Sequence, residues 1–309
     1  MRRTVCSTFF QTMDSINRNL TAHIVAFLTV AVWGSTFIST KVLIMNGLSA
    51  AQIFTLRFAM AYVLMVCFSH RRWVCTTARD ELTMLLLGVT GGSLYFLTEN
   101  VALKYSTATN VSLIVCSCPL FTTLLFRLLF RSARLSMSQW AGTLFAFAGM
   151  VAVVLNGHFV LHLSPAGDSL ALAACICWAV YSLIMKTVGE GYSSAFITRK
   201  VFFYGLLTIL PYYLFCPGMP SIDVLSRPVV AANLLFLGAI ASMVCFLTWT
   251  WCMKQLGALK ATNYVYINPI ATIVFATWIL DEHITPWFVA GTLFILLGLY
   301  LSNKDARPC

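Results

Sequence analysis

The sequence predicts an all-α integral membrane protein with ten transmembrane helices, arranged as two inverted five-helix repeats around a central cavity. Three observations support this prediction: strong hydrophobicity, ten apolar runs of spanning length, and matching motifs in the two halves. Of the 309 residues, 60% are hydrophobic and only 10% are charged, whereas soluble domains carry about 25% charged residues. The apolar excess therefore requires lipid rather than water as its solvent.

The apolar runs are separated by short polar connections. They lie near residues 23–44, 51–69, 82–103, 108–130, 138–156, 168–187, 196–215, 230–252, 261–280 and 287–303. A span needs about 20 apolar residues, and a longer run fits by tilting. We therefore expect one repeat over 22–156 and another over 168–303, with cytoplasmic tails at 1–21 and 304–309. No cleaved signal is predicted, because no short apolar segment with a cleavage site follows the polar start.

The basic residues indicate the orientation of the chain. With the N-terminus inside, the segments expected outside contain Lys41, Lys104 and Arg227, and Arg57 falls within a span. The other sixteen of the 20 Lys and Arg residues then lie inside. This asymmetry follows the positive-inside rule. It predicts a multi-pass protein of the cell (inner) membrane with both termini cytoplasmic, and it explains the net charge of +10 without nucleic acid.

Matching motifs recur in order along the two halves. Ala141-Gly142-Thr143-Leu144-Phe145 recurs as Ala290-Gly291-Thr292-Leu293-Phe294, and Lys104, Ala108 and Pro119 correspond to Lys254, Ala258 and Pro269. Trp33 likewise corresponds to Trp178. Each half contains five predicted spans, an odd number, so the second half enters the membrane from the opposite side. Inverted repeats of this kind are typical of secondary transporters.

Glu99 is the acidic residue that lies clearly inside an apolar run. A carboxylate there is unfavourable unless it is paired, protonated or facing water. Arg57 is expected at a similar depth in the second span, which leaves two interpretations open. Either Glu99 lines a transport cavity, where it takes a proton or meets a cationic group, or Arg57 and Glu99 form a structural ion pair. Glu99 corresponds to Trp249 in the other half, so this feature is not repeated.

Pro119 and Pro269 are expected in the middle of the fourth and ninth spans. Proline removes a backbone hydrogen bond and kinks a helix. Paired broken helices at equivalent positions indicate a midplane binding site. The alternative is that both kinks only shape helix packing.

Aromatic and amide side chains recur near the expected cavity, and small-molecule sites combine such apolar walls with a few polar groups. The candidate substrate-binding residues are Trp33, Tyr95, Glu99, Asn110, Trp178, Tyr181 and Asn268. Trp and Tyr also favour membrane interfaces, so the pair Trp33 and Trp178 is the better supported. No cofactor, metal site or enzymatic activity is predicted, because there is no phosphate-binding loop and no nucleophile with an oriented base.

Several motifs resemble the drug/metabolite transporter superfamily, in particular the EamA-type ten-helix permeases. They are Trp33-Gly34-Ser35-Thr36-Phe37, Leu56-Arg57-Phe58, the segment Ala102-Leu103-Lys104-Tyr105-Ser106-Thr107-Ala108 leading to Pro119, Met253-Lys254-Gln255-Leu256-Gly257-Ala258, Asn268-Pro269, Asp281-Glu282 and Ala290-Gly291. The resemblance covers roughly residues 22–303. It departs from the family after the fourth span, where Arg131-Ser132-Ala133-Arg134 stands in place of a frequent Glu.

The resemblance implies an exporter of amino acids, other small metabolites or drugs that works by alternating access, driven by protons or by substrate gradients. The expected partners are a small-molecule substrate, the lipid bilayer and a coupling proton, without nucleic acid, for a monomer or a homodimer. Two alternatives remain. A nucleotide-sugar or phosphate-ester antiporter would need several basic residues in the cavity. A membrane receptor without transport would not need paired kinks or inverted repeats.

Overall fold

Every regular element that the computed structural model describes is a helix. The described residues are 2–106, 108–129, 136–155, 164–214, 218–271, 274 and 285–304. The first half contains α1 (Arg2–Met45), α2 (Ala50–Phe68), α3 (Ala78–Gly88), η1 (Val89–Ser93), α4 (Leu94–Tyr105), α5 (Ala108–Val115), α6 (Cys118–Leu129) and α7 (Met137–Leu155). The second contains α8 (Pro165–Thr187), α9 (Ser194–Ile209), η2 (Leu210–Leu214), α10 (Ile222–Leu225), α11 (Pro228–Leu235), η3 (Phe236–Val244), α12 (Cys245–Leu256), α13 (Ala258–Asn263), η4 (Tyr264–Ile267) and α15 (Pro286–Lys304).

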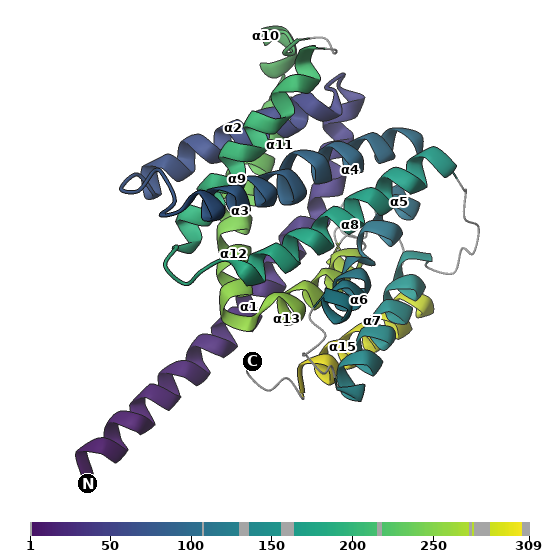
Figure 1. Cartoon of the computed structure of the whole chain (residues 1–309). Helices are drawn as coiled ribbons and strands as arrows, with labels where there is room; N and C mark the ends of the chain where they lie inside the picture. Colours follow the sequence, from purple (N-terminus) through teal and green to yellow (C-terminus); the bar gives the residue numbers. More distant parts are fainter. Residues whose placement is uncertain are drawn as a thin grey trace.

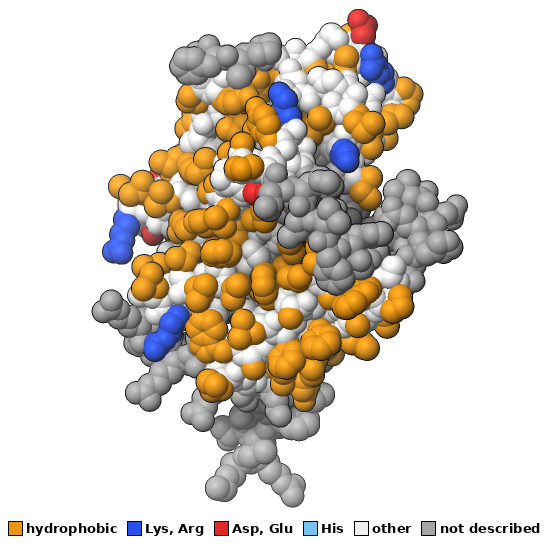
Figure 2. Space-filling view, turned by 90° about the vertical axis from the view of Figure 1, so that its right-hand side faces the viewer, with side chains coloured by type: hydrophobic (Ala, Val, Ile, Leu, Met, Phe, Trp, Pro, Cys, Tyr) orange, Lys and Arg blue, Asp and Glu red, His pale blue; other side chains and the backbone are white. Residues whose placement is uncertain are grey.

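Five helical stretches are long and apolar enough to cross a bilayer. They are Arg18–Met45, Ala50–Phe68, Ala78–Tyr105, Pro165–Thr187 and Pro228–Leu256, and three shorter apolar helices are Leu113–Leu129, Met137–Val153 and Pro286–Ser302. Apolar side chains are spread widely over the described part of the face in Figure 2, where charged side chains are few. The chain is therefore a multi-pass membrane protein. The count of ten spans remains a prediction, since the expected run at 261–280 lies partly outside the described residues.

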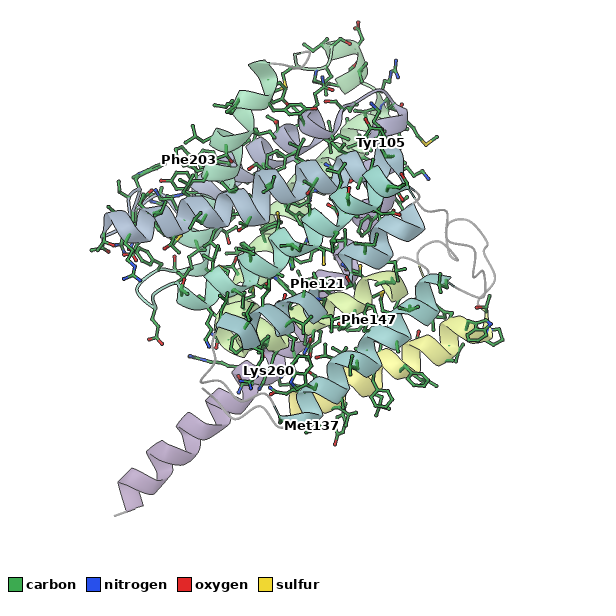
Figure 3. All side chains as sticks on the ribbon, turned by 45° about the vertical axis from the view of Figure 1, so that its right-hand side comes forward. Tyr105, Phe121, Met137, Phe147, Phe203 and Lys260 are labelled. Atoms are coloured by element: carbon green, nitrogen blue, oxygen red, sulfur yellow. The ribbon has the colours of Figure 1, made fainter. Side chains whose placement is uncertain are left out.

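The first helix extends beyond the membrane-spanning part. α1 begins at Arg2, so the polar segment predicted as a tail is helical and continues into the first apolar run. Its N-terminal part projects away from the bundle (Figure 1). Met137, at the start of α7, and Lys260 lie toward the same end, whereas Tyr105, at the end of α4, lies toward the opposite end (Figure 3).

Local sequence sets several helix starts. Ser49 and Gln52 form a reciprocal capping box at the start of α2. Thr77 and Ser193 accept hydrogen bonds from backbone N–H groups in the first turns of α3 and α9. These side chains satisfy donors that a helix start leaves without partners, a role for which Ser and Thr are preferred.

Two long helices are interrupted at corresponding places, by a kink at Gly92 in η1 and by the π-helical segment η3. η1 lies between α3 and α4, and η3 lies between α11 and α12. The helices that follow, α4 and α12, both have 12 residues. A π-helical segment shifts the backbone hydrogen bonds and is frequent at functional sites. Both segments therefore mark places where the fold departs from a regular helix.

α7 and α15 pack very closely and in opposite directions. A Cβ atom added to Gly142 would lie 2.6 Å from the carbonyl oxygen of Gly298, and one added to Gly149 would lie 2.5 Å from that of Gly291. Phe145 and Phe294 stack beside this contact with ring centroids 5.9 Å apart. Glycine lets two membrane helices approach until their backbones touch.

A polar network joins the α2–α3 connection to the second half. Glu81, near the start of α3, forms an ion pair with Lys200 of α9 and accepts a hydrogen bond from Tyr204. Tyr192 donates a hydrogen bond to Asp80 with an oxygen–oxygen distance of 2.7 Å. The network lies between residues 69–81 and 192–204, and it fastens the two halves at one end of the bundle.

Candidate functional site

A small cavity of about 40 Å³ lies inside the bundle. Its walls are Trp33, Thr36, Phe37, Arg57, Tyr95, Phe96, Glu99, Val115, Cys118, Trp178, Phe246, Val265 and Asn268. Their helices are α1, α2, α4, α5, α6, α8 and α12, together with η4 and the helical residue Asn268 that follows it. Mostly apolar walls with a few polar groups are typical of small-molecule sites.

Pairs of equivalent residues from the two halves line this cavity. Trp33 faces it with Trp178, Phe96 with Phe246, Val115 with Val265, and Cys118 with Asn268. The last three pairs are each separated by 150 positions, the spacing that also relates Pro119 to Pro269. Each half therefore contributes residues from the same positions of the repeated unit to this one cavity.

Trp33 and Trp178 form the aromatic centre of the site. Their rings meet edge to face with centroids 5.5 Å apart. The Trp33 indole N–H donates to the Ala241 carbonyl at 2.9 Å. The buried Trp178 indole N–H, by contrast, has no acceptor within the described part of the chain. A buried donor without an acceptor is unfavourable and is expected to meet a ligand or water.

Arg57 contacts side chains from both halves of the chain. Its Nε donates to Ser242 Oγ at 2.9 Å, and its guanidinium carbon lies 4.5 Å from the centre of the Phe96 ring. Only 2% of Arg57 is exposed. A charge buried this deeply normally requires an opposite charge nearby.

Glu99 lies on the same cavity, 7% exposed. Tyr95 donates to its Oε1 with an oxygen–oxygen distance of 3.2 Å. Within the described residues, Lys200 and Glu81 make the one ion pair shorter than 4.0 Å. Arg57 and Glu99 therefore share the cavity without touching, and the direct pair considered from the sequence is not formed in this conformation.

Both candidate prolines follow a break in their helix. α5 ends at Val115 and α6 starts at Cys118, directly before Pro119. In the other half the 3₁₀ segment η4 ends at Ile267, two residues before Pro269. Proline offers no N–H to the carbonyl four residues earlier. Those carbonyls belong to Val115 and Val265, which both line the cavity.

Most of the sequence-predicted site residues meet at the cavity. Trp33, Tyr95, Glu99, Trp178 and Asn268 line it together with Arg57. Tyr181 stands behind Trp178 with ring centroids 5.1 Å apart. The side chain of Asn110 lies outside the part of the chain that the structure describes.

The sequence analysis missed several wall residues: Thr36, Phe37, Phe96, Val115, Cys118, Phe246 and Val265. Apolar side chains in an apolar chain give no signal of their own. The repeat could have found three of the pairs, since the 150-residue spacing links Phe96 to Phe246 as it links the prolines.

A multi-pass helical bundle with a charged and aromatic cavity fits a membrane transporter. The model of the EamA-like transporter family matches residues 20–155 and again 165–304. The chain belongs to this family, and it contains the family domain twice.

Relatives over nearly the whole length are transporters by name. An "Uncharacterized transporter" of Archaeoglobus fulgidus is 26% identical over 92% of this chain and 98% of its own length. A "Probable terminal-alkyne amino-acid exporter" of Streptantibioticus cattleyicolor is 26% identical over 90% of this chain and 91% of its own. A "Probable amino-acid metabolite efflux pump" of Salmonella typhimurium is 25% identical over 90% and 93%.

A solved crystal structure shares the fold. It superposes with a TM-score of 0.72 at 19% identity and covers 93% of this chain and 98% of its own. Family and relatives together indicate a transporter of small molecules rather than an enzyme.

Proposed function

We propose that the protein is a secondary transporter that exports small zwitterionic metabolites, above all amino acids with apolar side chains, by alternating access. One observation carries this proposal. Arg57 and Glu99 are buried on the same cavity, have opposite charges and do not pair with each other.

An amino acid carries one group of each charge, so it can give both Arg57 and Glu99 a direct partner of opposite sign. Its carboxylate suits the guanidinium of Arg57, and its ammonium group suits the carboxylate of Glu99. The Trp178 indole N–H, which has no acceptor in the described chain, lies on the same wall and can donate to the substrate carboxylate. Binding a zwitterion would thus replace the water that both charges lose on burial.

The aromatic walls favour an apolar side chain. Trp33, Trp178, Phe96 and Phe246 surround the cavity, and such rings provide large apolar contact areas. The same rings are nearly fully buried, as are Arg57 and Glu99. A substrate therefore reaches the cavity after helices move, as alternating access requires.

The contacts between the halves support ten spans in inverted repeats. A two-fold axis that exchanges the halves would bring equivalent residues together across it. Phe145 and Phe294 are equivalent and stack, and Trp33 and Trp178 are equivalent and touch. Residues 22–156 and 168–303 would then be the repeats, with both termini in the cytoplasm of a cell whose inner membrane holds the protein.

The alternatives differ in what they require of the cavity. A phosphate-ester antiporter needs several cationic groups, and Arg57 is the one Lys or Arg among the described wall residues. A receptor without transport gives no reason for equivalent residues to line one cavity. The relatives named as amino-acid exporters favour export.

Flux of defined compounds through the purified protein tests the proposal. The protein is reconstituted into liposomes, and uptake of radiolabelled L-phenylalanine is measured with phenylpropionate or phenylethylamine as competitors. These competitors lack the ammonium and the carboxylate, respectively. We expect saturable uptake that both compounds inhibit weakly, because each keeps one of the two charge contacts.

Two variants test which buried charge binds which group of the substrate. Arg57→Gln should remove inhibition by phenylpropionate and leave inhibition by phenylethylamine, and Glu99→Gln should do the reverse. Uptake no higher than in protein-free liposomes would contradict the transport proposal. Equal effects of either variant on both competitors would contradict the assigned contacts.

A further inference from the structure

Ser242 is the side chain that fixes the direction of Arg57. It lies in η3, is fully buried, and accepts the hydrogen bond from Arg57 Nε at 2.9 Å. Phe96 supports the guanidinium from the side at 4.5 Å. An arginine has N–H donors on three nitrogens in one plane. With Nε used by Ser242, the two terminal nitrogens remain, and they make no hydrogen bond within the described chain.

The π-helical backbone of η3 provides a second anchor beside the first. The N–H of Cys245 bonds to the carbonyls of Ile240 and Ser242. In an α-helix it would bond to Ala241 instead, four residues earlier. The Ala241 carbonyl is thereby released, and it accepts the Trp33 indole N–H at 2.9 Å. The adjacent residues Ala241 and Ser242 of η3 therefore each bind one cavity residue, Trp33 and Arg57 respectively.

The corresponding segment of the first half is used differently. The 150-residue spacing that links Phe96 to Phe246 relates Ser242 to Gly92, and Ser93 of η1 follows Gly92 directly. Ser93 is also buried, but its hydroxyl bonds to Thr208 at 2.7 Å and lies away from the cavity walls. The chain thus contains its own matched control.

We propose that Ser242 is a positioning residue that orients Arg57 toward the substrate carboxylate. This inference rests on the proposed function and adds a residue that does not itself line the cavity. By holding Nε, Ser242 turns the pair of terminal nitrogens into the geometry that binds a carboxylate with two parallel bonds. Without Ser242 the guanidinium can rotate and point at the cavity wall.

The experiment compares Ser242→Ala with Ser93→Ala in liposomes. We expect Ser242→Ala to raise the KM for L-phenylalanine roughly tenfold, as loss of an ordered charge-assisted contact does, with an unchanged maximal rate. The inhibition constant of phenylpropionate should rise equally, while that of phenylethylamine stays constant. Ser93→Ala should leave all three values near wild type. A merely structural role of Ser242 would move both inhibition constants together.

Two further variants keep the inference testable. If Ser242→Ala does not fold, Ser242→Cys keeps the volume with a weak acceptor and should give the same selective loss. In an Arg57→Gln background, Ser242→Ala should have no additional effect, because the group that it orients is gone. An unchanged KM in Ser242→Ala, while Arg57→Gln still loses carboxylate recognition, would overturn the inference alone. No effect of Arg57→Gln would overturn the proposed contact beneath it.

Discussion

Trp33 of α1 and Trp178 of α8 meet edge to face with ring centroids 5.5 Å apart, although 145 positions separate them. They are equivalent residues of the two halves, and each lines the cavity. A contact between equivalent residues lies where the two halves meet. The cavity is therefore formed by both halves, and relative movement of the halves would change its access.

Glu99 should couple transport to protons. When the substrate leaves, a buried carboxylate is stabilised by taking a proton. We expect an acidic lumen to accelerate L-phenylalanine uptake into liposomes several-fold, because protons leave as substrate enters. Glu99→Gln should not respond to the gradient, and Glu190→Gln, an exposed turn residue, should respond as wild type. A full response of Glu99→Gln would exclude the coupling role.

The proline breaks should serve movement rather than stability. Pro119→Ala and Pro269→Ala each supply an N–H that can bond to the carbonyl of Val115 or Val265. We expect equal or higher melting temperatures and slower L-phenylalanine uptake, since the breaks become stiffer. Pro228→Ala, at the first turn of α11, is the control and should transport normally. Unchanged uptake in both variants would show that the prolines only shape packing.

The glycine contact between α7 and α15 should be needed for stability. Gly142→Leu places a side chain where only 2.6 Å separates the new Cβ from the Gly298 carbonyl. Overpacking of this kind costs about 1–3 kcal/mol or more. We expect a clearly lower melting temperature in detergent, measured by thermal unfolding. Gly189→Ala, which has no atom within 4 Å of the added Cβ, should melt as wild type does.

The Glu81–Lys200 pair should stabilise the end of the bundle where it joins α3 to α9. Lys200→Gln leaves a carboxylate with fewer partners in a largely buried place. The expected loss is about 2 kcal/mol, the typical contribution of a hydrogen bond to a charged group. The charge-swapped double variant Glu81→Lys/Lys200→Glu should regain part of it. Thermal unfolding of both variants checks this, and a charge swap less stable than Lys200→Gln would contradict it.

The sequence predicted the helical class and six of the thirteen wall residues of the cavity from signals with a physical basis. Charged residues such as Arg57 and Glu99 are rare within membrane spans, so they indicated a functional site. The repeated motifs indicated that Trp33 and Trp178 are equivalent. Phe96 and Phe246 gave no such signal, because apolar residues are equally common on lipid-facing surfaces. The π-helical segments were not predicted either. In η3 the departure depends on which carbonyl the Cys245 N–H bonds to, and the Trp33 hydrogen bond to Ala241 is a tertiary contact that favours it.

Counterflow tests the central claim most directly, because it requires a carrier that alternates between two sides. Liposomes containing the protein are loaded with unlabelled L-phenylalanine and diluted into a trace of labelled compound. We predict transient accumulation of label above the external concentration, weaker in the Arg57→Gln variant and absent in protein-free liposomes. Label that only approaches the external concentration, or that never enters, would contradict an alternating-access transporter of zwitterions built around Arg57 and Glu99.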